Sequence, residues 1–314
     1  MALQEKKNQI HGIHHITAIS GPAKQNYDFY TGVLGLRFIK KTVNFDDPFT
    51  YHLYYGNYEA SPGSAITFFP WNHVVQGKPK TGETIDTQYA IPEGSLPYWR
   101  DYLKSKGVTN VHEGSLYGMP TLGFHDPDQL RILLIEDKAV NEIANHASGD
   151  VADEHSIRGF FGATLDVPDI RKTAELLEEF GWKLEGSEGN ITRYSSEPDS
   201  MLGRYIDLVQ ARSGAGRFGK GSIHHIAFRV PNSEMEEKWR IKLIEMGYQP
   251  TIAQERFYFR SIYFREKGGV LFEIATDEPG FTADEPLEKL GSDLKLPPWY
   301  EPHRSRIKES LPEL

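Results

Sequence analysis

The sequence predicts an α+β fold of four βαβββ modules, paired into two half-barrel domains that each surround a cleft. One order of elements, a strand, a helix and then further strands, recurs four times along the chain. Two adjacent histidines inside an apolar, β-branched run occur in the first copy, at 12–20, and again in the fourth, at 222–230. Such self-similarity indicates one supersecondary unit used repeatedly. Because a lone unit cannot cover its own sheet, the units are expected to pair around a cavity.

Each module begins with a strand, continues with an amphipathic helix that ends at a glycine, and finishes with strands bounded by turn residues. The first strands are expected at 13–19, 87–91, 159–167 and 223–230, and the helices at 23–34, 96–106, 169–180 and 233–247. The later strands are expected at 37–43, 50–55, 65–69, 129–136, 191–195, 204–210, 257–264 and 270–276.

The polar stretch 137–156 has little periodicity and is interpreted as a linker between two halves. We therefore expect an N-terminal domain of residues 1–145 and a C-terminal domain of residues 146–314, each with two modules. The tail after Asp277 has weak periodicity and is expected to pack as a C-terminal extension.

Composition narrows the classes of function. The chain has 314 residues, of which 39% are hydrophobic and 25% charged, as in globular proteins. Its net charge of −9 and the absence of a basic tract argue against nucleic acid and anionic membranes as partners. No apolar run approaches the ~20 residues that span a bilayer, and the N-terminus has no signal-peptide pattern, so a cytoplasmic protein is expected. With no cysteine, a metal would have to be bound by His, Asp or Glu.

The strongest candidates for chemistry are His15, His225 and Glu273. Two imidazoles and one carboxylate form a ligand set for a divalent first-row metal, and one such arrangement serves Fe(II) oxygen chemistry. Glu273 lies in an otherwise apolar run, 270–275, where a buried glutamate is most easily explained by a cation. Successive strand side chains point to opposite faces, so one histidine of each pair faces the site, but alternation alone does not tell which.

Six short motifs in a specific order carry a family resemblance. They are Ile-His-His-Ile-Thr at 13–17, Tyr-His-Leu-Tyr-Tyr at 51–55, Ala-Ile-Pro-Glu-Gly-Ser-Leu at 90–96, Ile-His-His-Ile-Ala-Phe at 223–228, Gly-Gly-Val-Leu-Phe-Glu at 268–273 and Leu-Gly-Ser-Asp-Leu-Lys at 290–295. With these motifs, nearly the whole chain resembles the vicinal oxygen chelate superfamily, and more closely its ring-cleaving extradiol dioxygenases that act on hydroquinones.

The resemblance implies that His15 and His225, the second histidine of each pair, bind Fe(II) together with Glu273, and that the first and fourth modules form the active cup. Mn, Ni or Zn could replace iron in the purified protein. The implied reaction opens a hydroquinone- or catechol-type ring with O2, so the expected partners are a small aromatic substrate and O2. The sequence leaves open the ring substituents and whether copies of the chain form a homo-oligomer.

The resemblance also implies roles around the metal. His224 would be an acid/base, suited by the ordinary histidine pKa, although alternation requires it to reach the cavity from a rim. Thr17 would form a hydrogen bond beside the ligands, and Arg256 and Tyr263 would contact substrate or the oxygen intermediate. His52 and His125 are interpreted as structural.

The face on which Tyr263 lies depends on the loop before Glu273. A two- or four-residue loop would put the two side chains on opposite faces. A three-residue loop at 266–268, with Gly268 left-handed and a bulge, would put them on one face. In a regular strand, Arg256 would point to the face opposite that of Tyr263. It is therefore expected before the regular strand or beyond a bend.

Two other functions are compatible with parts of this pattern. A glyoxalase-like isomerase or thiol transferase would use Ni, Zn or Mn on the same fold, without O2. A metal-free protein that sequesters an aromatic drug would keep the cavity but would not require two histidines and a glutamate to converge.

Overall fold

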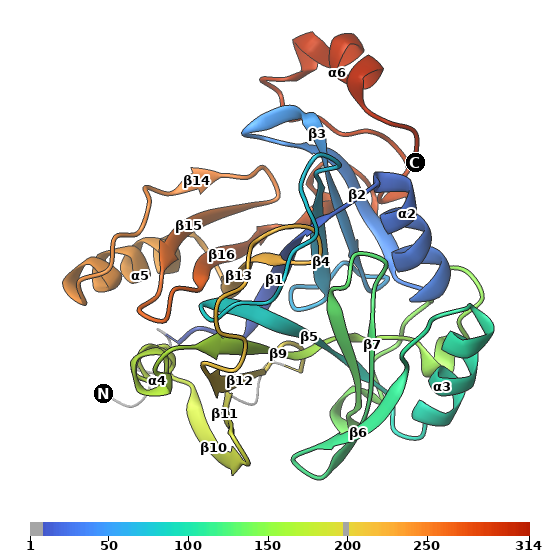
Figure 1. Cartoon of the computed structure of the whole chain (residues 1–314). Helices are drawn as coiled ribbons and strands as arrows, with labels where there is room; N and C mark the ends of the chain where they lie inside the picture. The colour runs from blue at the N-terminus through green and yellow to red at the C-terminus, as the bar shows by residue number, and fades with distance from the viewer. Residues whose placement is uncertain (1–8, 197–200) are drawn as a thin grey trace.

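The computed structural model of the chain describes residues 9–196 and 201–314, which form two curled eight-stranded sheets with helices against them (Figure 1). The first sheet has the order β14-β15-β16-β13-β1-β4-β3-β2, and the second has the order β10-β11-β12-β9-β5-β8-β7-β6. The α+β fold and the half-barrel modules predicted from the sequence are confirmed.

The elements lie close to their predicted positions. The first sheet contains β1 (Ile13–Ser20), β2 (Arg37–Asn44), β3 (Asp47–Gly56), β4 (Ala65–Pro70), β13 (Ile223–Val230), β14 (Gln254–Glu255), β15 (Phe259–Arg265) and β16 (Leu271–Pro279). The second contains β5 (Glu83–Ile91), β6 (His112–Leu116), β7 (Met119–His125), β8 (Arg131–Glu136), β9 (Gly159–Val167), β10 (Lys183–Glu188), β11 (Ile191–Ser195) and β12 (Tyr205–Gln210).

Each module has its helix after the first strand. These helices are α2 (Ala23–Tyr27), α3 (Leu96–Ser105), α4 (Ile170–Glu179) and α5 (Ser233–Glu245). The first helix continues after Tyr27 as a π-helix, Asp28–Val33, in which the Leu34 amide donates to the Phe29 carbonyl. Helices α4 and α5 are capped at their N-termini by Asp169 and Asn232, whose side chains accept hydrogen bonds from backbone amides of the first turn.

The pairing of modules positions the functional site. The first sheet joins the first and fourth modules through antiparallel β1 and β13, and the second sheet joins the second and third through antiparallel β5 and β9. The two histidine-containing strands are therefore neighbours. Each sheet takes one module from either side of the predicted boundary at residues 145 and 146, and the division of the chain into domains there stays a prediction.

The C-terminal tail packs against the first sheet, next to β2 and β3, and ends in α6 (Arg304–Ser310) (Figure 1). Lys40 of β2 is fully buried, and its ammonium group contacts the carboxylates of Asp284, at 2.5 Å, and Glu285. It also lies 4.9 Å from the centre of the Tyr258 ring. This buried ion cluster attaches the tail to the sheet.

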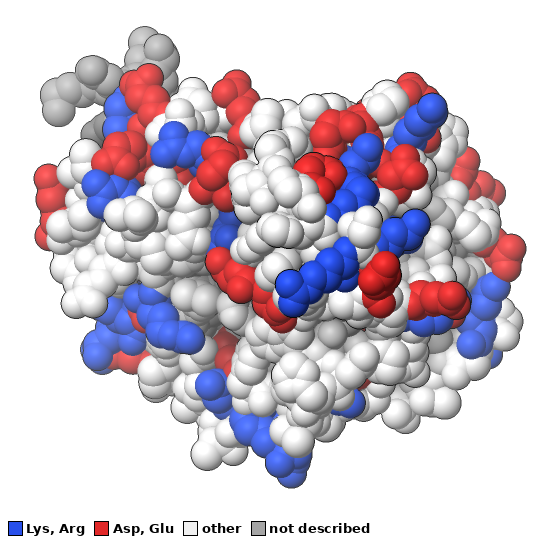
Figure 2. All heavy atoms as spheres, turned by 90° about the horizontal axis from the view of Figure 1, so that it is seen from above, with Lys and Arg blue, Asp and Glu red and all other residues white. Residues whose placement is uncertain are grey.

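The exposed charges are mixed. Figure 2 shows acidic and basic side chains interspersed on the face seen from above, in keeping with the net charge of −9. Within residues 9–196 and 201–314, no helix has both the length and the apolar character that crossing a membrane requires.

Candidate metal centre

His15, His225 and Glu273 converge at one buried point of the first sheet. The Nε2 atoms of His15 and His225 lie 3.2 and 2.9 Å from Oε2 of Glu273, and 3.4 Å from each other. All three side chains are at most 5% exposed, and one ligand atom from each lies within 4.8 Å of the others. The structure thus brings together the three residues that the resemblance identified.

Sheet register explains this convergence. Glu273 lies beside Ala227 across β16 and β13, and Ala227 lies beside His15 across β13 and β1. His225 lies two residues before Ala227 on the same face of β13. The strands are about 4.8 Å apart, and the small side chain of Ala227 leaves space for its three larger neighbours to meet. The ligand set is therefore built from three adjacent strands around an alanine.

The chemistry of the donor atoms fits a cation. In the described part of the chain, neither oxygen of Glu273 accepts a directed hydrogen bond, despite the two close imidazole nitrogens. Burial by itself raises the pKa of Glu273, but His15 and His225 outweigh it and hold the pKa well below its ordinary value. Burial lowers the pKa of His225. Neutral imidazole and ionised carboxylate are the forms that bind metals.

In the second sheet, the carboxylate at the corresponding position is neutralised by a side chain of the protein. Asp207 of β12 lies opposite Arg193 of β11, just as Glu273 of β16 lies opposite Tyr263 of β15. The Arg193 guanidinium forms two hydrogen bonds with Asp207, of 2.7 and 2.8 Å, and both side chains are buried. A permanent cation of the protein therefore neutralises this buried carboxylate. The first strands of the two middle modules contain no histidine, as predicted.

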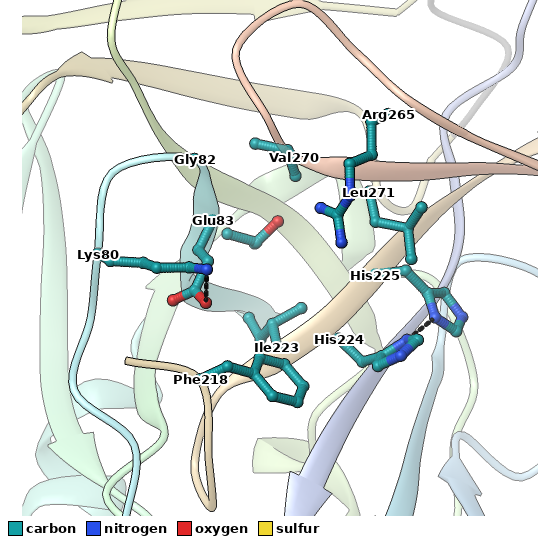
Figure 3. Close-up of a pocket in the computed structure, with 11 residues that line it drawn as sticks. Lys80, Gly82, Glu83, Phe218, Ile223, His224, His225, Arg265, Val270 and Leu271 are labelled. Atoms are coloured by element: carbon teal, nitrogen blue, oxygen red, sulfur yellow. Dashed lines mark hydrogen bonds and ion pairs between the residues drawn. The ribbon is translucent and has the colours of Figure 1, made fainter. Parts of the chain in front are cut away.

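The first histidine of each pair contacts the second. The Nδ1 atoms of His14 and His15 are 2.9 Å apart, and those of His224 and His225 are 2.8 Å apart. The second contact is drawn in Figure 3. These contacts leave Nε2 of His15 and His225 facing Glu273. The second histidine of each pair is therefore the one that faces the site.

A chamber of about 450 Å³ is lined by two of the three residues, His15 and His225. Its walls are largely aromatic, with a polar group of side chains on one side; they include His52, Tyr54, Phe69, Trp71, Phe259, Tyr263, Asn44, Asp46, Gln254 and Arg256. An apolar, aromatic cavity with a few convergent polar groups is the usual form of a small-molecule site.

His224 lines both this chamber and a smaller cavity of about 170 Å³, whose lining residues are drawn in Figure 3. Its ring is edge-on to Phe69 and Trp71 on one side and close to Phe218 on the other. The half-buried side chain therefore reaches the chamber from its rim, as strand alternation required. Burial lowers the pKa of His224 to about 3, so its imidazole is neutral, in contrast to the ordinary histidine pKa expected from the sequence.

Tyr263 lies on the same face as Glu273, because β15 and β16 pair these two residues directly. The same-face alternative is confirmed, but the predicted position of the loop is wrong by one residue: the Glu266 amide donates to the Val270 carbonyl, which leaves a three-residue loop at 267–269 and not at 266–268. The regular pairing stops at Arg265 and Leu271, and the left-handed glycine of the connection is Gly269, with φ of 98°, not Gly268.

Arg256 lies in the bend between β14 and β15, outside the regular strand, as expected from strand alternation. Its Nε donates to the Tyr263 hydroxyl at 3.3 Å, and its Nη2 donates to Oε1 of Gln254 at 2.5 Å. The guanidinium also lies 3.4 Å from Asp46 of the β2–β3 connection. Arg256 thus joins a residue beside the ligands to the polar side of the chamber.

Thr17 is buried and is connected to a residue that sequence reasoning missed. Its hydroxyl contacts that of Thr67 at 2.8 Å, and Thr67 contacts Nε2 of His52 at 2.8 Å. The hydroxyl of Tyr54 forms a hydrogen bond with Nδ1 of His52, at 2.9 Å. His52 lines the chamber, so it is more than a structural residue. Strand alternation in 51–55 puts His52 on the same face as the aromatic Tyr54. This is the one sequence signal that could have placed His52 in the chamber wall.

The chain is similar to known proteins in family, in sequence and in structure. The family described as "Glyoxalase/Bleomycin resistance protein/Dioxygenase superfamily" matches residues 12–203. The chain is 44% identical to "Putative ring-cleaving dioxygenase MhqO" of Bacillus subtilis (strain 168), over 96% of this chain and 95% of that protein. It is 32% identical to the chlorohydroquinone/hydroquinone 1,2-dioxygenase of Sphingobium indicum, over 98% of both proteins. A crystal structure of a "putative dioxygenase" from Bacillus subtilis superposes with a TM-score of 0.93, at 43% identity over 98% of both chains.

Proposed function

The chain belongs to the Glyoxalase/Bleomycin resistance protein/Dioxygenase superfamily, and from that premise we propose that it is an Fe(II)-dependent dioxygenase that opens hydroquinone- or catechol-type rings with O2. The observation that carries the proposal is the convergence of His15, His225 and Glu273 on the wall of an aromatic chamber. Its relatives bear the names of ring-cleaving dioxygenases.

His15, His225 and Glu273 would hold the metal. Two neutral imidazoles and one carboxylate are a set that Fe(II) oxygenases use, because it leaves several coordination positions open. When bound, Fe(II) would supply those positions to a substrate hydroxyl and O2 and would let electrons pass from the ring to oxygen, a reaction that spin otherwise forbids.

The chamber would bind and orient the substrate ring. Phe259 packs against the ring of His15, with centroids 5.0 Å apart, and Tyr263 lies edge-on to His225 at 5.5 Å. Together with Phe69 and Trp71, these rings surround the ligand histidines with apolar surface. A planar apolar ring would therefore be held near the metal ligands, and bulk water would be displaced from them.

The polar groups would manage charge and protons. The hydroxyl of Tyr263 and the guanidinium of Arg256 would stabilise negative charge that develops on oxygen during the reaction. His224, whose neutral imidazole reaches the rim of the chamber, would take up a proton on Nδ1 from the substrate hydroxyl once water replaces that nitrogen as the partner of His225, and would later return the proton. Thr17, through Thr67, would hold His52 in one orientation in the chamber wall.

Oxygen uptake tests the proposal. Protein loaded anaerobically with Fe(II) would receive methyl- or chloro-hydroquinone, with catechol in parallel, while O2 and the ultraviolet spectrum are followed. We expect one O2 consumed per ring and a new ring-opened chromophore. No uptake by protein that holds one iron per chain would refute the dioxygenase and favour the isomerase or thiol transferase on this fold.

A further inference from the structure

Each ligand histidine is preceded by a second histidine, and both couples have the same geometry. In each, the ring centroids are 5.1 Å apart and the rings are nearly perpendicular, at 81° and 80°. In each couple, the Nδ1 atom of the first ring contacts the Nδ1 atom of the second. Adjacent strand residues would ordinarily point to opposite faces. The recurrence of this contact in β1 and β13 indicates that it serves the site.

Proton positions follow from the geometry of the first couple. His15 presents Nε2 to Glu273 and His225, so a metal would be bound by the Nε2 lone pair and the His15 proton must lie on Nδ1. Two Nδ1 atoms 2.9 Å apart share one proton. Nδ1 of His14 is therefore the acceptor, and the proton of His14 lies on Nε2.

The surroundings of His14 hold its ring in place. His14 is 2% exposed and packs against Phe259, with ring centroids 5.3 Å apart. Its ring is thus confined with Nδ1 toward Nδ1 of His15.

We propose that His14 is a positioning residue for the metal centre: it accepts the Nδ1–H of His15, fixes the Nε2 lone pair of His15 toward the metal, and is itself held by packing against Phe259. The inference rests on the proposed metal-binding role of His15. Metal-ligating histidines commonly donate their second ring N–H to an oxygen, and such partners contribute about 10–100-fold to metal affinity. Here a second imidazole takes the place of that oxygen.

The two couples differ in what the first histidine can do besides positioning. His224 contacts His225 through Nδ1, but among the described residues nothing accepts from its Nε2, and it lines both cavities. His224 can therefore reach substrate, and water from the cavities can replace it as the partner of His225. His14 has neither solvent nor chamber beside it, so its loss leaves His15 without a substitute acceptor.

Zn(II) binding by two variants tests the role. His14→Phe keeps a ring but removes the acceptor, whereas His14→Asn keeps an oxygen near the position of Nδ1 but loses the ring. In calorimetric titrations with Zn(II) alone, we expect His14→Phe to bind about 10–100-fold more weakly than wild type and His14→Asn to stay within about threefold. His11→Phe, nearby on the same segment, should leave the affinity unchanged. A residue that only fills space would give the opposite order, because Phe preserves more packing.

A direct measurement of the tautomer completes the test. In the Zn(II)-loaded wild type with 15N-labelled histidine, NMR should find His15 protonated at Nδ1 and His14 protonated at Nε2 only. Protonation of His14 at Nδ1, or wild-type Zn(II) affinity in His14→Phe, would overturn the inference while the metal site stands. Wild-type protein that binds no Zn(II) would overturn both the site and the inference, whereas Zn(II) binding without oxygen uptake by the iron form would refute only the dioxygenase.

Discussion

Asp207 in the second sheet occupies the position that Glu273 occupies in the first, but Asp207 is paired with Arg193 and Glu273 is not paired with any permanent cation among the described residues. Both carboxylates are fully buried. An ionised carboxylate away from water requires compensation. One half-barrel supplies it from its own sequence, and the other has instead an arrangement that suits a metal.

This contrast gives a matched pair of substitutions. Glu273→Gln should abolish Fe(II) and Zn(II) binding without unfolding the chain, because it removes a charge that no side chain fully neutralises. Asp207→Asn should keep one metal per chain but lower the free energy of unfolding by about 3–5 kcal/mol, because it leaves Arg193 buried without its partner. Metal analysis and urea denaturation of both variants would check this. A Glu273→Gln protein with full metal content would refute the ligand assignment.

Ala227 should be a sensitive position, since its small side chain lies between Glu273 and His15. Ala227→Leu would fill the space in which the ligand atoms meet, so we expect loss of metal binding together with an overpacking cost of about 1–3 kcal/mol. Ala227→Ser, which adds a single atom, should retain the metal. Equal metal affinity in both variants, measured by calorimetry, would contradict the position of the metal derived from the sheet register.

The two histidines of the fourth module should separate metal binding from turnover. His225→Ala is expected to abolish iron binding. His224→Ala should still hold one iron per chain at saturating Fe(II), while kcat falls by about 10²–10⁴-fold because the proton acceptor is missing. Iron content and single-turnover rates would be measured on the same samples. Iron-free His224→Ala protein at saturating Fe(II) would show that this division of roles is wrong.

Arg256 and Tyr263 should act on the rate more than on substrate affinity, because they would contact charge that develops only during the reaction. We expect Tyr263→Phe and Arg256→Gln each to lower kcat by about 10²–10³-fold, as for other donors to a developing oxyanion, with small changes in KM. The pair is joined by a hydrogen bond, so the double variant should lose less than the product of the two effects. Asp46→Asn, which alters only the exposed end of the Arg256 contacts, should lower kcat far less than either of these variants.

Local pattern sufficed to predict the modules. The strands and helices could be predicted because their hydrophobic periodicity and the glycines that end the helices are local signals, contained within a few residues of sequence. The pairing of the first module with the fourth depends on long-range contacts and came from the family resemblance. The place of His52 in the chamber wall was not predicted because its alternation with Tyr54 is local, whereas the face that lines the chamber depends on the β3–β4 register, which pairs Tyr54 with Thr67. The choice of Gly269 over Gly268 likewise depends on the β15–β16 register, which no local signal distinguishes.

Glu236 of α5 should make stability depend on pH. Its side chain is fully buried, neither carboxylate oxygen has a hydrogen-bond donor among the described residues, and Arg260 comes only to 3.6 Å. Burial raises its pKa to about 7, opposed by Arg260 and reinforced by Glu237, Glu255 and Glu273.

Because the folded state binds this proton more tightly than the unfolded state, whose pKa is near the ordinary 4.5, stability is lost as the pH rises from about 4.5 to 7. Glu236→Gln cannot ionise and should escape that loss. We expect the variant to resemble wild type at pH 5 and to be more stable by at least about 1 kcal/mol at pH 8, measured by urea denaturation at both values. Glu237→Gln, one residue further on an exposed face of α5, should show no such pH-dependent gain. A stability difference between Glu236→Gln and wild type that is the same at pH 5 and pH 8 would mean that Glu236 is already ionised in the fold at pH 5, with Arg260 as its counterion.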